Sequence, residues 1–98
     1  MRTSIIRTDT VPSAGAAPEI AGPSPRRVAL LFLPSTTTNY TVSTESGVSL
    51  NNGLTLAQNG ELLELTLERH GEIVRRAWYA IAAASTTVSF LETFEDGE

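Results

Sequence analysis

The sequence predicts an all-β protein: an antiparallel β-sandwich, jelly-roll-like or a small barrel, with an extended N-terminal arm. Two observations predict it. Short runs rich in β-branched, aromatic and leucine residues recur along the chain, and clusters of Gly, Asn, Ser or Pro separate them about every eight to twelve residues. This spacing is typical of a sandwich or barrel of about seven short strands joined by hairpin-like turns. We find no internal repeat and no βαβ unit.

Residues 1–24 differ in composition from the rest of the chain. They contain Pro12, Pro18 and Pro23, and proline removes a backbone donor and restricts the residue before it. We therefore expect an extended arm, which is either a loose terminus or a segment that becomes ordered on a partner. The residues expected to contact that partner are Arg2, Ile5, Ile6, Arg7, Val11 and Ile20. The sandwich domain is expected over residues 25–94, and an acidic tail over residues 95–98.

The first half of the sandwich is expected to contain four strands. The first is a continuous apolar run that ends at Pro34, as expected for a buried strand. The others are short β-branched, aromatic or leucine-rich runs, and Asn51-Asn52-Gly53 forms a tight turn between the last two. The four predicted strands are residues 26–33, 39–44, 48–50 and 54–56.

The second half is expected to contain three strands. Residues 61–69 (ELLELTLER) alternate leucine with polar residues, which is the period of a half-buried strand. Leucine and glutamate are also good helix formers, so a helix is the alternative there. His70-Gly71 predicts a turn, and residues 72–82 and 86–94 predict the last two strands. Trp78 is expected in the core, and Tyr79 is expected to be partly exposed or at an interface.

Composition excludes several classes of protein. The net charge of −4 argues against a nucleic-acid partner, which requires a basic surface. Without cysteine and with one histidine, the chain has neither disulfides nor a thiolate or histidine-rich metal site. The longest apolar run is too short to span a membrane. A folded part of about 70 residues is marginal alone, so we expect support from oligomerisation or from docking on a larger body.

No catalytic or cofactor-binding residues are predicted. His70 lies in an expected surface turn, and no Gly-x-Ser-x-Gly motif is present. The pair Arg75-Arg76 should point to opposite faces of a strand, where it either blocks edge aggregation or pairs with Glu64 or Glu68. The candidate subunit-interface residues are Glu64, Glu68, Arg75, Arg76 and Tyr79. The exposed aromatics of a carbohydrate-binding module could come only from Trp78, Tyr79 and Tyr40.

Four runs of the sequence together resemble a known family of proteins. They are RRVALLF at residues 26–32, GLTL with NGE within residues 53–61, WYAIAA at residues 78–83 and VSFLE at residues 88–92. Together they resemble small β-sandwich virion proteins of tailed bacteriophages. The resemblance implies a non-enzymatic capsid decoration or cement protein that binds the outer surface of a phage head. A head-fibre, tail-fibre or adaptor module is the alternative.

The resemblance also implies a location and partners. The protein would be made in the host cytoplasm and reside in the virion, bound to the major capsid protein or another virion protein. It would form a homo-oligomer, a dimer or a trimer, and it would bind neither nucleic acid nor membrane. Its arm would reach neighbouring capsid subunits, and no cofactor is implied.

Overall fold

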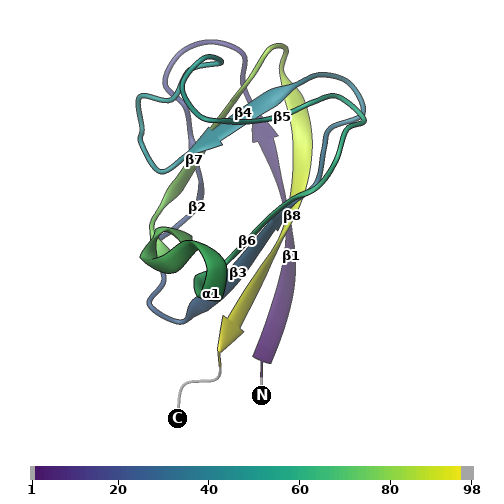
Figure 1. The fold of residues 1–98 in the computed structure, drawn as a ribbon. Helices are drawn as coiled ribbons and strands as arrows, with labels where there is room; N and C mark the ends of the chain where they lie inside the picture. Colours follow the sequence, from purple (N-terminus) through teal and green to yellow (C-terminus); the bar gives the residue numbers. More distant parts are fainter. Residues whose placement is uncertain (1, 96–98) are drawn as a thin grey trace.

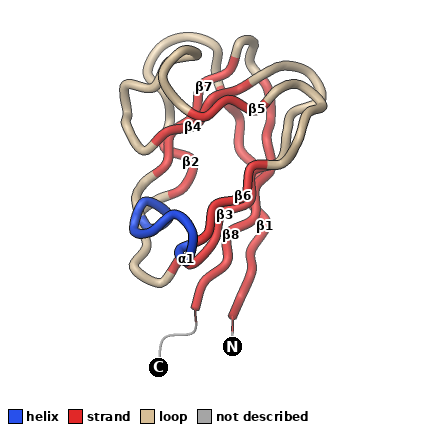
Figure 2. Tube along the Cα trace, viewed as in Figure 1, coloured by secondary structure: helices blue, strands red, loops and turns tan. Residues whose placement is uncertain are grey.

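A computed structural model describes residues 2–95, with the side chain of Arg2 left out (Figure 1). These residues form eight strands and two short helical segments, and the tube in Figure 2 is almost entirely strand and loop. Neither helical segment within residues 2–95 is long and apolar enough to cross a membrane. The strands are β1 (Arg2–Val11), β2 (Glu19–Ala21), β3 (Arg27–Phe32), β4 (Tyr40–Ser43), β5 (Leu54–Leu56), β6 (Leu63–Thr66), β7 (Trp78–Ala82) and β8 (Thr86–Glu95). The helices are α1 (Leu67–His70) and the 3₁₀ helix η1 (Gly71–Arg75).

The strands form two antiparallel sheets of four. Sheet A has the order β1-β8-β3-β6, and sheet B has the order β2-β7-β4-β5. The first strand therefore pairs with the last, the second with the seventh, the third with the sixth and the fourth with the fifth. This is the strand order of an eight-stranded jelly roll, a long antiparallel hairpin folded over into two sheets. The predicted all-β sandwich is confirmed.

The core lies between the two sheets and follows the period of two along each strand. Phe32 of sheet A packs on Trp78 of sheet B and on Phe90 of its own sheet, with ring centroids 5.8 Å apart for Phe32–Trp78 and 5.6 Å for Phe32–Phe90. Trp78 is buried, as expected. Aromatic pairs of this kind add about 0.5–1.5 kcal/mol beyond the area they bury. The rest of the core is aliphatic apart from Tyr40: Val11, Ile20, Leu30, Val42, Leu56, Leu65, Val74 and Val88 are all buried.

The N-terminal segment differs from the separate arm expected from its composition. β1 pairs with β8 over its whole length, and β2 pairs with β7. The prolines and glycines restrict only the connections after β1 and β2. Six of the ten β1 residues are β-branched (three Thr, two Ile, one Val), and none is Pro or Gly, a composition that favours a strand. Residues 2–21 therefore contribute an edge strand to each sheet.

The expected strand over residues 61–69 is also corrected, because only Leu63–Thr66 is a strand. Thr66 caps α1 by accepting a hydrogen bond from Arg69 N at 3.2 Å, and Gly71 ends the helix with φ of 74°. His70 Nδ1 accepts from Thr66 N at 3.0 Å. The chain then continues as η1, so strand β7 begins only at Trp78. The alternation continues to Glu68, but the cap at Thr66 and the helix propensity of the residues after it prevail.

Residues 48–50 are not a strand but part of the β4–β5 loop, which lies over the outer face of sheet B. Val48 is buried there. Gly53 lets the loop approach β4 closely, because a Cβ on it would lie 2.6 Å from Thr41 Cγ2 and 2.7 Å from Val42 O. Thr41 is fully buried although its side chain points away from the core. The loop therefore covers part of the outer face of sheet B.

Candidate functional site: an arginine pocket beside the β1 edge

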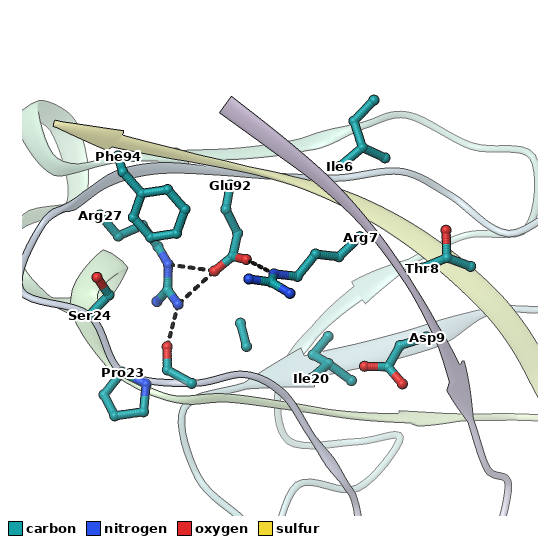
Figure 3. A pocket seen from close by; sticks show the side chains of 12 residues that line it. Ile6, Arg7, Thr8, Asp9, Ile20, Pro23, Ser24, Arg27, Glu92 and Phe94 are labelled. Atoms are coloured by element: carbon teal, nitrogen blue, oxygen red, sulfur yellow. Dashed lines mark hydrogen bonds and ion pairs between the residues drawn. The ribbon is translucent and has the colours of Figure 1, made fainter. Parts of the chain in front are cut away.

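Three charged side chains converge between the sheets near the open edge of the sandwich (Figure 3). Glu92 lies on the inward face of β8, opposite Leu30 of β3 and Ile5 of β1. Arg27 begins β3 opposite Phe94, and Arg7 lies on β1 opposite Phe90. The antiparallel register therefore places one arginine on each side of a single carboxylate.

Arg27 is buried, and each of its five N–H donors is used. Nε and Nη2 donate to Glu92 Oε2 at 3.1 and 2.8 Å. Nη1 donates to the carbonyls of Val74 and Arg76, both at 3.0 Å, and Nη2 also donates to the Gly22 carbonyl. A guanidinium has five N–H groups, so Arg27 has none left for a ligand. It joins β3, β8, the β2–β3 connection and η1, and its role is structural.

Arg7 binds the same carboxylate from the solvent side. Its Nε donates to Glu92 Oε1, and its side chain is 53% exposed. Its other N–H groups make no hydrogen bond to a side chain or backbone within residues 2–95. Two guanidinium groups share one carboxylate, so the three side chains carry a net charge of +1. Arg7 is thus held in position while most of its donors stay available.

A pocket of about 590 Å³ opens in front of Arg7; we call it the arginine pocket. Its walls are β1, the segment from Ile20 to Ser24, and the inward side of β8 at Glu92 and Phe94. Figure 3 shows Arg7 and Asp9 both projecting from β1 toward this space. The only polar contact of the Asp9 carboxylate within the described residues is with Thr10 N, at 3.2 Å. The unused N–H groups of Arg7 are donors of the kind that a carboxylate or another anion accepts from, and the carboxylates of Asp9 and Glu92 line the same pocket.

The outer face of sheet A is a second candidate surface. Ile6, Leu91 and Leu31 form one row across β1, β8 and β3, and Glu64 of β6 ends the row. Ile6 is 73% exposed. Serine and threonine side chains flank the row and bind one another, with Ser4–Thr93 at 3.0 Å and Thr8–Ser89 at 3.3 Å. Between Ser4 and Glu95, the charged groups that the register places on this face are Glu64 and Glu95, both near its rim.

Of the six residues expected to contact a partner, some are exposed in the structure and others are buried in the core. Ile5 and Ile6 are exposed, and Arg7 lines the arginine pocket. Val11 and Ile20 are 0% and 6% exposed within the core, so they are not available to a partner. The Arg2 side chain lies outside the described residues.

The five expected subunit-interface residues do not share one surface. Glu64 is on β6 of sheet A, whereas Tyr79 is half-buried on β7 of sheet B. Glu68 is on α1, and Arg75 and Arg76 lie at the end of η1 rather than in a strand. Arg75 does not pair with Glu64 or Glu68: it bonds to Glu72 at 3.5 Å and to the Arg27 carbonyl at 3.2 Å.

The ion cluster and Asp9 were not among the site residues predicted from the sequence. A signal was present in the last strand, where Glu92 has the same parity as Val88, Phe90 and Phe94. A carboxylate at an inward position needs a buried cation. Arg27, at the start of the most apolar strand, is the matching cation. Arg7 and Asp9 differ by two positions on β1, a spacing that places both side chains on one face of a strand.

Comparison with protein-family models and with curated proteins finds no match for this sequence. Among residues 2–95, no group of three or more His, Cys, Asp or Glu side chains could hold a metal ion. His70 is exposed at the end of α1, with its Nδ1 bound to backbone. The candidate site consists of an available guanidinium beside a strand edge and an uncovered, nearly uncharged sheet face.

Proposed function

We propose that the protein is a non-enzymatic structural component of a virion, a decoration protein that self-associates and binds the outer surface of a phage head. The observation that carries the proposal is the outer face of sheet A. Ile6, Leu91 and Leu31 form an apolar row there, bordered by serine and threonine, and Ile6 is 73% exposed. A face of this kind is suited to flat protein–protein contact, because little charge has to be desolvated.

The fold is compatible with this proposal but does not select it. Jelly rolls occur in viral capsid proteins, lectins and cupins, and one fold serves many functions. The surface chemistry favours a protein partner over a sugar. Trp78 and Tyr40 are 1% and 0% exposed, so neither offers a ring on which a carbohydrate-binding module would stack its ligand, and Tyr79 is half-buried and is the only one of the three with an accessible ring. A fibre or adaptor position in the virion would use the same face, and the experiment below distinguishes the positions.

The test uses virions purified on a density gradient from cells that carry the gene. We expect the protein to band with the particles at a fixed ratio to the main shell protein, and gold-labelled antibody to mark the head. Label confined to the tail or fibres would favour the alternative position. Protein that stays entirely in the soluble fraction would contradict the proposal.

A matched pair of variants tests the face itself. Ile6→Asp places a charge in the apolar row and should lower particle occupancy at least about tenfold, since a charge buried in an interface is costly. Ile73→Asp is the control, because Ile73 is an exposed isoleucine on η1, outside sheet A. Both variants should keep the circular dichroism of the unmodified protein. Equal occupancy for both variants would exclude this face as the binding surface.

A further inference from the structure

We propose that the β1 edge pairs antiparallel with β1 of a second copy, so that Asp9 of each chain enters the arginine pocket of the other and binds Arg7. The pairing is centred on Thr8 and has two-fold symmetry. This inference rests on the self-association in the proposed function and names the surface that performs it.

The outer edge of β1 supports this pairing. β1 pairs with β8 on one side, and no strand of the described chain lies on its other side. The strand is ten residues long, and every second residue of an edge strand presents N–H and C=O groups without a partner strand. Proteins protect such edges with proline, bulges, charged side chains, inward-pointing charges or very short strands. Residues 3–11 contain no proline or lysine, and their register with β8 is continuous. Their inward-pointing charges are one of each sign, Arg7 and Asp9, so a second copy can pair with them rather than be repelled.

The charges on β1 are complementary between two antiparallel copies. Arg7 and Asp9 share the inward face of β1 because they are two positions apart. In an antiparallel pair centred on Thr8, Arg7 of each copy lies directly opposite Asp9 of the other, with Cβ atoms about 4.5–5.5 Å apart. Registers centred on Arg7 or on Asp9 would instead place identical charges opposite each other. The charges therefore select one register.

Unused N–H groups on Arg7 give a second copy a place to bind. Arg27 and Arg7 share the single carboxylate of Glu92, and Asp9 of the same chain lines the pocket without a hydrogen bond to Arg7. Asp9 of the second copy would accept from the Nη groups of Arg7, which have no partner within residues 2–95. Glu92 already fixes the Arg7 guanidinium, so little conformational entropy is lost on binding.

The pairing also links the two candidate surfaces. A two-fold axis perpendicular to sheet A keeps the outer faces of both copies on the same side. The two sheets would then form one continuous sheet of eight strands, with the order β6-β3-β8-β1 followed by its mirror sequence in the second copy. Both Ile6 side chains would lie on one broad face, as binding to a large surface requires.

Sedimentation velocity of the purified full chain, with no particles present, tests this proposal. The unmodified protein should sediment as a dimer. Asp9→Arg should raise the dimer dissociation constant at least about 100-fold, because it places two arginines opposite each other twice. Glu19→Arg is the matched control, since it reverses an exposed acid on β2, outside the β1 edge, and should leave the dimer intact.

A mixing experiment tests the register. Arg7→Asp and Asp9→Arg should each be monomeric alone and should form a heterodimer when mixed, because the opposite charges then face each other at both positions. If Arg7→Asp does not fold beside Glu92, the Asp9→Arg and Glu19→Arg pair decides the question. A dimeric Asp9→Arg protein, or an unmodified protein that is monomeric at all concentrations, would overturn the proposal.

The two proposals can fail separately. If Ile6→Asp abolishes particle binding while Asp9→Arg stays dimeric, the proposed function stands and the β1 pairing is wrong. If the protein dimerises as described but never bands with particles, the pairing stands and the proposed function is wrong.

Discussion

Arg27 and Arg7 bind the same carboxylate, yet they have opposite roles. Arg27 is 1% exposed and uses all of its donors within the chain, whereas Arg7 is 53% exposed and uses one. A buried guanidinium with every donor satisfied joins parts of the fold and cannot bind a ligand. A half-exposed guanidinium with unused donors contributes little to stability and can bind one. The number of engaged donors, rather than the residue type, separates structure from function here.

The largest loss of unfolding free energy is expected for a substitution at Arg27, the buried arginine of this cluster. Arg27→Met keeps an unbranched apolar side chain but leaves Glu92 without its buried partner and three backbone carbonyls without donors. Breaking a buried ion pair by removing one partner costs about 3–5 kcal/mol of unfolding free energy. Urea unfolding followed by circular dichroism measures this. A loss below about 1 kcal/mol would mean that Arg27 is not the structural half of the pair.

Glu92→Gln should have a smaller effect. The amide keeps the shape of the side chain but loses the charge shared by both arginines, and one of its polar atoms can no longer accept from Arg27 or Arg7. We expect a loss of about 1–3 kcal/mol in the same urea experiment. A loss as large as that of Arg27→Met would show that the charge of Glu92, rather than the bonds from Arg27 to carbonyls, dominates the cluster.

Tyr40 extends the comparison to a buried group that is neutral. Its hydroxyl donates to the Leu33 carbonyl at 2.5 Å, and burial raises its pKa well above the ordinary value of 10.0. Above that ordinary pKa the unfolded chain loses the proton while the folded chain keeps it. Stability is therefore unaffected below about pH 10 and should fall by about 1.4 kcal/mol per pH unit above it.

Tyr40→Phe is the control for this pH dependence. It should cost about 1 kcal/mol at neutral pH through the lost hydrogen bond and should remove the contribution of Tyr40 to the alkaline slope. Urea unfolding at a series of alkaline pH values gives the slope of unfolding free energy against pH for the unmodified protein and for Tyr40→Phe. Identical slopes for the two proteins would contradict a raised pKa at Tyr40.

The smallest effect on stability is expected on the exposed side. Arg7→Ala should cost less than about 1 kcal/mol, because exposed ion pairs contribute little. The comparison is made at a protein concentration below dimerisation, since association adds stability to the folded state. The same variant should lose self-association. A large loss of stability in the monomer would place Arg7 with Arg27 in the structural half of the cluster.

The sandwich could be predicted from the sequence for two reasons. The alternation of apolar and polar residues reflects burial, as in the last strand and at Trp78. The turn signals recur at a spacing typical of short strands. The sequence did not predict that β1 belongs to sheet A, since composition averaged over residues 1–24 concealed a β-branched strand followed by a proline-rich connection. The Arg27–Glu92 pair joins residues 65 positions apart in the chain. Such a pair depends on strand order, and strand order cannot be obtained from local patterns.

The exposed edge of β1 is proposed as a binding surface, and hydrogen–deuterium exchange on the unmodified protein is the sharpest test of that proposal. Exchange is measured at one concentration below dimerisation and at one above it. We expect additional protection at the higher concentration, confined to peptides from residues 2–11, where edge amides gain partners. Exchange of these amides that is the same at both concentrations, or protection that appears instead on β5 or β6, would contradict it.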